Sequence, residues 1–374
     1  MRRYSGMKFL WLEGVFDEKT VKRFESNSPA SNYWQTGFIN ALQKMDYKVY
    51  IVGHVVERIW PFGRLLVKKK DAATPKEFEG VIFGFINSFF LRRTSQYFNY
   101  LRQIKAYLLI SKDVSYTVTF SCLESEKKVT ASILSARYIK KNFGIPWICI
   151  VADGVAPHGA DQYIYLTWSY FKSISSLGPK MHIDGGVSNI DNQTSNEISR
   201  KNKVLMYMGA LTEHGGAFQL VKAFSLLKDK DIRLWVCGRG KNEELLNIAK
   251  ADDRINIMGF VSESRIIELA SKATAFVNPR PVNFKPNELN YPSKILHYFS
   301  FCKPVLSTMT PGISDEYYNV LNIMPNEGDI GHSIQSILNM EKDVYYAKCQ
   351  DISNFNEKHS WEYQVARFVS WLEG

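Results

Sequence analysis

The second half of the chain alternates apolar segments with segments of helical spacing, and this rhythm constrains the fold most. Apolar residues at helical spacing predict helices at 216–230, 242–251, 262–273 and 292–301. The segments between them predict strands at 203–211, 232–238, 255–261, 274–279 and 304–309. Alternating apolar strands and helices imply a parallel sheet covered on both faces. Ligand sites in such sheets lie at the carboxyl ends of the strands.

The first half follows the same rhythm less regularly. Strands are predicted at 7–14, 47–53, 79–86, 116–121, 146–153 and 180–186, with helices at 32–45, 129–143 and 170–177. The polar segment 187–203 has no periodicity and is interpreted as a linker. We therefore predict an α/β protein with two Rossmann-like, doubly wound domains, residues 1–187 and 188–358, that face an interdomain cleft. A last helix, 359–374, is expected to pack back toward the first domain.

Charge is unevenly distributed along the chain. Residues 1–180 hold 26 Lys and Arg against 14 Asp and Glu, a net charge of +12, whereas residues 181–374 hold 21 against 23, a net charge of −2. The basic half is expected to face an anionic partner, which is a nucleic acid, an acidic membrane or a phosphorylated acceptor. The sequence contains no recognisable nucleic-acid-reading motif, so the first of these is disfavoured.

Cysteine usage and hydropathy point to the cytoplasm. The five cysteines are widely spaced, which indicates neither a zinc site nor a disulfide framework. The sequon Asn192-Gln193-Thr194 is accordingly expected to have no role. No apolar run is long enough for a transmembrane helix, and "MKFLWLEG" is interpreted as a first strand that ends in a turn at Gly14. The Asp229-Lys230-Asp231 segment is expected to be a solvated turn rather than a metal site.

The segment "NPRPVNFKPNELNYPSKILH" contains the most informative motif, where a strand end meets a helix start. Pro292 is predicted at the first helical position, which leaves N–H groups free, and Ser293 and Lys294 add a hydroxyl and a cation in the first turn. A cation there opposes the helix dipole unless an anion lies between them. Alternatively, Lys294 points to solvent. His297, one turn further, either contacts a hydroxyl-bearing ligand or is structural.

Two weaker motifs lie at other strand ends. In "CGRGK", Gly238 allows the backbone to approach an anion and Arg239 adds charge, although a tight turn with solvated cations explains the motif equally well. Asp153 ends the strand "WICIVAD", where a carboxylate suits ligand hydroxyls or proton transfer, or caps a turn. His158 follows it and is a weaker candidate.

The segment 86–112 combines apolar and basic residues. The pattern predicts one apolar side, with Arg92 and Arg93 among the cations beside it. Together with the "WPFGRLLVKKK" segment at 60–70, this suits an anionic membrane surface, while a core helix with a solvated basic face is the alternative. The residues predicted along the apolar side are Phe89, Phe90, Tyr97, Leu101, Ile104 and Leu108.

The stretches "YMGALTEHGG", "MHIDGGV" and "VNPRPVNFKPNELNYPSKILHYFSFCKPVLSTMTPGISDEYY" resemble the retaining glycosyltransferases of family 4, which have the GT-B fold. The likeness is strongest over 203–320 and favours the branch that builds bacterial exopolysaccharide, capsule or lipopolysaccharide. It implies a nucleoside-diphosphate sugar on the second domain and an acceptor on the first. It also implies transfer with retention, without metal or other cofactor, in which the leaving phosphate takes the acceptor proton.

The sequence patterns above and the resemblance together give roles to residues of this chain. Asp153 and Lys294 are expected to be catalytic, and Arg92, Arg93 and His158 to lie on the acceptor or membrane side. No metal ligand is expected. The residues expected to bind the donor are Gly14, Gly209, Gly238, Arg239, Arg280, Tyr291, Pro292, Ser293 and His297.

The sequence departs from the family at its paired glutamates and at two cations. The first glutamate position holds Leu289, beside Glu288, and the second holds His297. The positions of the usual Arg and Lys hold Ala210 and Gly215, so the positive charge for the phosphate is expected to come from elsewhere, chiefly from Lys294. We expect a peripheral enzyme on the cytoplasmic face of the plasma membrane with a lipid-diphosphate-linked saccharide acceptor. A non-catalytic nucleotide-sugar-binding subunit and a GT-B-type sugar-nucleotide epimerase are the alternatives.

Overall fold

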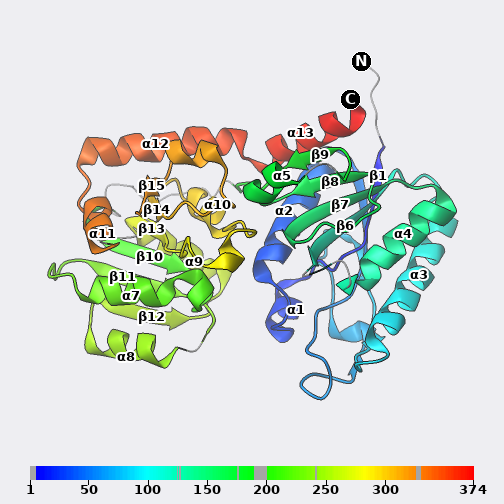
Figure 1. Ribbon diagram of the computed structural model, residues 1–374, viewed down its shortest axis with the longest axis horizontal. Helices are drawn as coiled ribbons and strands as arrows, with labels where there is room; N and C mark the ends of the chain where they lie inside the picture. Colours follow the sequence, from blue (N-terminus) through cyan, green and yellow to red (C-terminus); the bar gives the residue numbers. More distant parts are fainter. Residues whose placement is uncertain are drawn as a thin grey trace. The chain divides into compact units, whose positions relative to one another are not determined.

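The structure is a computed structural model that describes residues 6–123, 125, 128–174, 177–188, 200–240, 242–325 and 330–374. The chain divides into two compact units (Figure 1). Unit 1 consists of Met1–Leu166, Tyr170–Gly186 and Val365–Gly374, and unit 2 of Thr167–Ser169 and Val187–Gln364. The sequon at 192–194 and most of the expected linker lie outside the described residues.

Unit 1 contains a parallel sheet with the strand order β4-β2-β1-β6-β7-β8-β9. The chain runs from the central β1 outward to β2 and β4, and then returns to β6 on the other side, which is the doubly wound arrangement. The strands are β1 (Lys8–Trp11), β2 (Lys48–Gly53), β4 (Glu79–Ile82), β6 (Tyr116–Leu123), β7 (Trp147–Gly154), β8 (Gln162–Tyr165) and β9 (Lys180–His182). The helices are α1 (Glu18–Arg23), α2 (Pro29–Lys44), α3 (Arg92–Ile110), α4 (Ala131–Phe143) and α5 (Trp168–Ser173).

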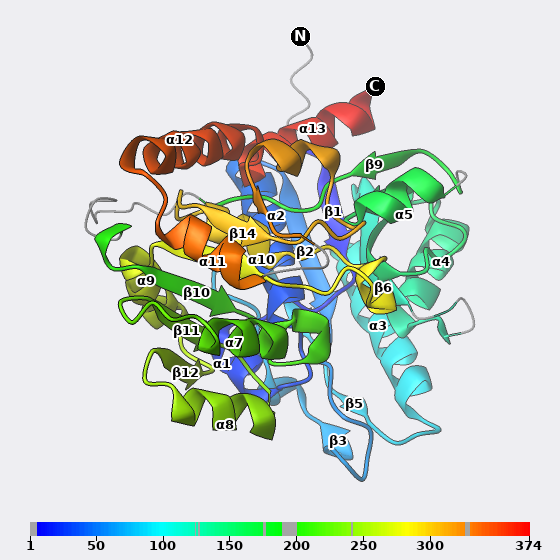
Figure 2. The same ribbon diagram turned by 60° about the vertical axis from the view of Figure 1, so that its left-hand side comes forward.

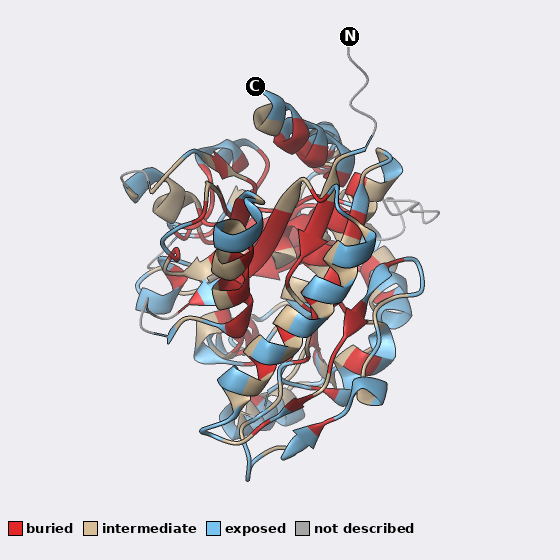
Figure 3. Cartoon of the chain, turned by 90° about the vertical axis from the view of Figure 1, so that its right-hand side faces the viewer, coloured by how far each residue is buried: buried red, intermediate tan, exposed pale blue. Residues whose placement is uncertain are grey.

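Alternate residues of β1 pack against the two helical layers of unit 1. Phe9 and Trp11 point toward α2 and the last helix, α13 (Trp361–Glu373), where Phe9 contacts Phe368. Leu10 and Leu12 point to the opposite face and join the core beneath α3 and α4. Figure 3 shows these strands buried behind helices whose outer faces are exposed. The two-residue period of a strand therefore explains why Phe9, Leu10 and Trp11 of β1 are all apolar although they point to both faces of the sheet.

Unit 2 repeats the doubly wound pattern with the strand order β12-β11-β10-β13-β14-β15, again parallel throughout (Figure 2). The strands are β10 (Val204–Met208), β11 (Arg233–Cys237), β12 (Ile255–Gly259), β13 (Ala275–Asn278), β14 (Val305–Ser307) and β15 (Asn322–Ile323). The helices are α7 (Ala217–Ser225), α8 (Glu243–Ala251), α9 (Glu263–Lys272), α10 (Lys294–Phe299), α11 (Ile330–Leu338) and α12 (Lys342–Lys358). The two Rossmann-like domains expected from the sequence are confirmed.

Two local predictions for unit 1 are wrong. The strand expected at 79–86 is divided, because β4 belongs to the main sheet whereas β5 (Phe85–Ile86) pairs antiparallel with β3 (Leu66–Val67). The helix expected within 86–112 begins only at Arg92, so Phe89 and Phe90 precede it and are exposed. The buried face of α3 is formed by Gln96, Tyr100 and Ile104.

Candidate functional site

The candidate site in unit 2 lies where the chain reverses its direction of winding. β10 is flanked by β11 on one side and by β13 on the other, so the connections from the carboxyl ends of β10 and β13 diverge there. Such a switch point is the usual ligand site of an open parallel α/β sheet. The residues that follow the two strands are Gly209 and Pro279.

Tyr298 fixes α10 above this switch point. Its buried hydroxyl accepts a hydrogen bond from the amide of Met208 at 2.9 Å and lies 3.2 Å from the carbonyl oxygen of Val277. One side chain therefore contacts the ends of both central strands. Lys294, one helical turn earlier on α10, is held over the same strand ends.

The ammonium of Lys294 lies over the first turn after β10. Its Nζ is 4.2 Å from the centre of the Tyr207 ring, and it would lie 3.0 Å from a Cβ placed on Gly209. Burial lowers the pKa of Lys294 well below its usual range, and the positive charge of Arg280 lowers it further. Within the described part of the chain, Lys294 forms no ion pair with a carboxylate. A bound anion would relieve this electrostatic cost.

Two further basic side chains converge on Lys294. Arg280 follows β13, and its guanidinium donates a hydrogen bond to the side-chain oxygen of Asn290. His214 lies in the turn after β10, and burial, with the charges of Arg280 and Lys294, lowers its pKa to about 4. His214 is therefore neutral at pH 7, and the positive charge of Arg280 disfavours the protonated form of Lys294 until an anion binds. This arrangement is typical of an anion site and was indicated in the sequence only by Arg280 and Lys294.

The backbone before α10 contributes less than the sequence predicted. The helix begins at Lys294 rather than at Pro292, and Ser293 precedes it without a side-chain capping bond. The amide of Ser293 already donates a hydrogen bond to the carbonyl oxygen of Tyr291 at 2.9 Å. The amide of Ile295 donates to the carbonyl oxygen of Pro292, also at 2.9 Å. These two N–H groups are therefore not available as the free donors expected from an early helix start.

Tyr291 and Pro292 have a packing role in the structure. Both are buried, and the Tyr291 hydroxyl is 2.8 Å from the hydroxyl of Tyr317. The side chain of Tyr291 belongs to the core of unit 2, and the donor contacts expected of Tyr291 and Pro292 stay a prediction. The two residues support the turn that carries Lys294.

The "CGRGK" motif adjoins the same strand ends. A Cβ on Gly238 would lie only 1.6 Å from the carbonyl oxygen of Gly209, so a glycine is required where the turns after β10 and β11 meet. The guanidinium of Arg239 lies 4.0 Å from the centre of the Phe260 ring. Lys241, the last residue of the motif, lies outside the described residues. Close packing of the two turns thus explains why residue 238 is a glycine. The contact with the Phe260 ring holds Arg239 beside these strand ends.

His297 is paired with an acid that the sequence did not indicate. Its Nε2 lies 3.3 Å from a carboxylate oxygen of Glu263, the first residue of α9. The hydrogen bond from His297 lowers the pKa of Glu263. α10 carries His297 where the resemblance leads one to expect a glutamate, and α9 brings a carboxylate beside that imidazole.

The other candidate residues belong to unit 1. Asp153, near the end of β7, is paired in register with Cys122 of β6, and Gly14 follows β1. His158 is exposed, and its carbonyl oxygen accepts two hydrogen bonds from Arg137. Arg92 opens α3 with its guanidinium 5.9 Å from the Phe85 ring, whereas Arg93 is exposed. These residues form no single cluster, and only Asp153 and Gly14 lie at the carboxyl ends of neighbouring or near-neighbouring strands.

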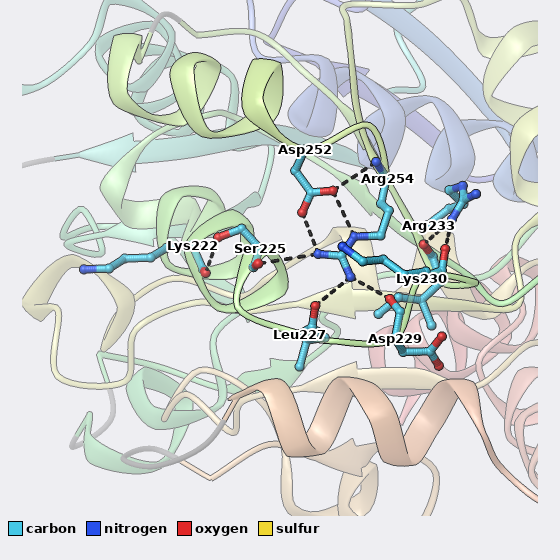
Figure 4. A network of polar contacts seen from close by, with 9 residues as sticks. Lys222, Ser225, Leu227, Asp229, Lys230, Arg233, Asp252 and Arg254 are labelled. Atoms are coloured by element: carbon cyan, nitrogen blue, oxygen red, sulfur yellow. Dashed lines mark hydrogen bonds and ion pairs between the residues drawn. The ribbon is translucent and has the colours of Figure 1, made fainter.

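A second group of charges lies at the opposite, amino edge of the six-stranded sheet (Figure 4). Arg254, buried just before β12, donates hydrogen bonds to both carboxylate oxygens of Asp252 and to the carbonyl oxygens of Leu227 and Asp229. The backbone amide of Asp231 donates to the Asp229 side chain at 2.9 Å, which makes this segment a closed turn. Among the described residues, no group of three metal-ligating side chains was found here or elsewhere.

Comparisons with known proteins support a glycosyltransferase of the GT-B class. Residues 202–341 match the family model described as glycosyl transferases group 1. The sucrose-phosphate synthase of Thermosynechococcus elongatus is similar in structure, with a TM-score of 0.70, 12% identity and coverage of 98% of each chain. No curated protein matches the chain in sequence.

Two other solved structures share the fold. HepE of Anabaena in complex with UDP and glucose matches with a TM-score of 0.64 and 11% identity, over 97% of this chain and 99% of that one. The trehalose-6-phosphate synthase OtsA matches with a TM-score of 0.66 and 9% identity, over 98% and 99% of the two chains. At these identities the likeness establishes the GT-B fold, and the family match lies in unit 2, where the cations converge.

Proposed function

We propose that this protein transfers a sugar from a nucleoside-diphosphate sugar, bound by unit 2, to a saccharide acceptor bound by unit 1. The observation that carries the proposal is the position of Lys294, a cation over the switch point beside a second cation and a neutral histidine. A diphosphate supplies negative charge to Lys294, which forms no ion pair with a carboxylate in the described part of the chain. As the bond to the sugar breaks, Lys294 and Arg280 stabilise the charge that grows on the leaving phosphate.

The finer features of the proposal come from the resemblance to family 4. Transfer proceeds with retention and without a metal ion, and the leaving phosphate takes the proton of the acceptor hydroxyl. Asp153 orients the acceptor at the end of β7. The imidazole of His297 together with the Glu263 carboxylate binds the ribose hydroxyls of the donor, since a carboxylate accepts hydrogen bonds from such a diol.

Isothermal titration calorimetry with UDP tests the assignment of unit 2. Lys294→Ala is expected to weaken UDP binding by about 10- to 100-fold, as for the loss of hydrogen bonds to a charged group. Lys272→Ala, which removes an exposed lysine of α9 in the same unit, is the matched control and should bind as the wild type does. Equal affinity of the Lys294→Ala variant and the wild type would remove the diphosphate from this site.

Turnover separates the proposed enzyme from its two alternatives. A transferase releases the nucleoside diphosphate and forms a new glycoside, whereas an epimerase leaves the sugar on the nucleotide. A non-catalytic subunit binds the donor and forms neither product. Incubation with nucleotide sugars, followed by mass spectrometry of the nucleotide and of any glycoside, distinguishes the three.

An anionic membrane surface is the second partner that we propose, because unit 1 exposes an apolar patch beside cations. Phe62 and Phe90 are 81% and 85% exposed. Asn87 joins the two segments that carry them, since its amide donates to Leu65 at 2.7 Å and its carbonyl oxygen accepts from Trp60 at 3.1 Å. The exposed apolar residues of the patch are Trp60, Phe62, Leu65, Leu66, Ile86, Phe89, Phe90 and Leu91.

Exposed cations lie in the same segments as this apolar patch. They are Arg58, Lys68, Lys69, Lys70 and Arg93. Aromatic residues beside Lys and Arg suit the headgroup region of an anionic bilayer. Such binding would place the enzyme on the cytoplasmic face of the plasma membrane, beside a lipid-diphosphate-linked acceptor of surface polysaccharide synthesis. In the described residues, no helix has the length and hydropathy needed to cross a membrane.

Vesicle flotation tests the membrane proposal. Phe62→Ser with Phe90→Ser is expected to abolish association with vesicles that contain phosphatidylglycerol, and neutralising Arg92 and Arg93 is expected to weaken it. Phe143→Ser, which changes an exposed phenylalanine at the end of α4, is the matched control. If the double phenylalanine variant floats as the wild type does, the membrane-facing surface lies elsewhere.

A further inference from the structure

The switch point of the seven-stranded sheet in unit 1 carries a second cluster of titratable groups. β1 lies between β2 and β6, so the turn after β1 has the same topological position as the turn after β10 in unit 2. Glu13 lies in this turn and is largely buried. A glycine follows it because a Cβ on Gly14 would lie 2.1 Å from the Phe16 ring and 2.8 Å from the carbonyl oxygen of His54.

Four neighbouring elements bring polar groups toward Glu13. The Tyr100 hydroxyl of α3 lies 3.4 Å from the carbonyl oxygen of Leu12, and Tyr100 and Cys122 of β6 both interact electrostatically with the Glu13 carboxyl. Asp153 of β7 is paired in register with Cys122. From the end of β2, His54 abuts Gly14 through its carbonyl oxygen.

Glu13, His54, Tyr100 and Cys122 are uncharged at neutral pH, and the charged group near His54 is Arg92. Burial raises the pKa of Glu13 to about 8 and that of Cys122 to about 12. Burial and the charge of Arg92 lower the pKa of His54 to about 4. The Nδ1–H of His54 donates to the carbonyl oxygen of Val55 at 2.9 Å, which leaves Nε2 as an acceptor. Burial keeps Tyr100 protonated, with a pKa well above its usual value.

The chemistry of this cluster differs from that of an ion site. A neutral carboxylic acid both donates and accepts a hydrogen bond, as does a sugar hydroxyl, whereas the cationic site of unit 2 suits a phosphate. Keeping an acid buried and neutral also costs stability above pH 4.5, because the unfolded chain would release the proton. Groups held in this way at a strand end are typical of functional sites.

We propose that Glu13 is a hydroxyl-binding residue of unit 1, at the centre of a site for an uncharged saccharide formed by the ends of β1, β2, β6 and β7 and by α3. The inference deepens the proposed function, because the saccharide is the acceptor of the transfer. Glu13 acts as a hydrogen-bonding group that orients the acceptor hydroxyl. It lies in the other unit from Lys294.

Saturation-transfer NMR with methyl glycosides of the common hexoses tests this site in the full-length protein. At pH 7 the wild type and Glu13→Gln are expected to bind at least one glycoside, because glutamine keeps a neutral donor and acceptor. Glu13→Ala should weaken that binding roughly tenfold. Glu25→Gln, at an exposed position of the same unit, is the matched control.

The pH dependence separates a hydroxyl-binding role from a purely structural one. Above pH 8 the wild-type carboxyl loses its proton and glycoside binding should fall, whereas binding to Glu13→Gln should not. The stability of the wild type should also decrease between pH 4.5 and 8, since the folded state holds a proton that the unfolded state releases, and Glu13→Gln should remove this slope.

Two results would overturn the inference. One is unchanged glycoside binding in Glu13→Ala, and the other is the absence of any glycoside signal for a wild-type protein that binds UDP. The second result would leave the donor assignment intact, because UDP affinity is measured on the same samples. Conversely, glycoside binding without UDP binding would support Glu13 and refute the role of Lys294.

Discussion

The two edges of the six-stranded sheet in unit 2 each hold a basic side chain, and the two differ in how far the protein itself satisfies their charge. At the amino edge, Arg254 donates hydrogen bonds to Asp252 and to backbone carbonyl oxygens around it (Figure 4). At the carboxyl edge, Lys294 lies over the Tyr207 ring, near a second cation. A fully bonded cation stabilises the fold, whereas a cation without an anion is suited to receive one.

The same contrast separates the two switch points. The turn after β10 in unit 2 is surrounded by cations, whereas the turn after β1 in unit 1 carries an acid that burial keeps protonated. The sheets have the same topology at these points, so the side chains rather than the fold decide which ligand chemistry each one suits.

The largest effect that tests the comparison is expected for Arg254→Met. The substitution leaves the Asp252 carboxylate and several carbonyl oxygens without their donor, which should lower the free energy of unfolding of unit 2 by about 3–5 kcal/mol. Hydrogen–deuterium exchange of β11 and β12 in urea measures this loss. UDP affinity of the folded variant should equal that of the wild type, and an unchanged stability would contradict the structural role.

A smaller effect of opposite sign is expected for Lys294→Met in the absence of ligand. Removal of a partly buried cation beside Arg280 should leave the stability unchanged or raise it by up to about 1 kcal/mol. The pKa of Lys294 is lowered on folding, so the folded wild type binds fewer protons than its unfolded chain. The stability of the wild type therefore rises as the pH rises toward 10.5, and the stability of Lys294→Met should lack this pH dependence.

Thermal unfolding with and without UDP completes the test of Lys294. UDP should raise the melting temperature of the wild type much more than that of Lys294→Met, since only a ligand bound to the folded state stabilises it. If Lys294→Met were destabilised in the absence of UDP, as Arg254→Met is expected to be, Lys294 would have a structural role. The basic side chains at the two edges of the sheet would then not differ in function.

The smallest effect is expected at the surface of α9. Lys272 lies 2.8 Å from Glu268, and both side chains are about half exposed. Ion pairs in water contribute little, because solvent and salt screen them. Lys272→Ala should therefore change neither the melting temperature nor the affinity for UDP. A clear change in either would mean that exposed charges of unit 2 also contribute to its stability or to UDP binding.

Much of the fold could be predicted because it depends on local periodicity. The apolar runs of β7, β10 and β13 and the helix α9 were predicted at their observed places, to within a few residues at their ends. The division of 79–86 into two strands was not predicted, since it depends on which strand each half meets. The positions of Phe89 and Phe90 were predicted wrongly because the helical pattern was extended to residues that precede the first turn of α3.

The candidate site shows the same division between local and long-range information. Lys294 and Arg280 were predicted from a single stretch, because a cation at a helix start and one at a strand end are visible in the sequence. The contacts of His297 with Glu263, and of Tyr298 with the ends of two strands, were not predicted. They join residues of different elements, whose proximity depends on the order of the strands.

The sequence by itself determined the α/β architecture, the two doubly wound domains and the segment that carries the cations, because apolar spacing and turn residues act over a few positions. Only the tertiary structure decided that Lys294 lies over Gly209, that α9 supplies an acid beside His297, and that Glu13 is buried enough to stay protonated. The pKa of a side chain and its partners depend on burial and on neighbours brought together by sheet topology, which local patterns do not encode.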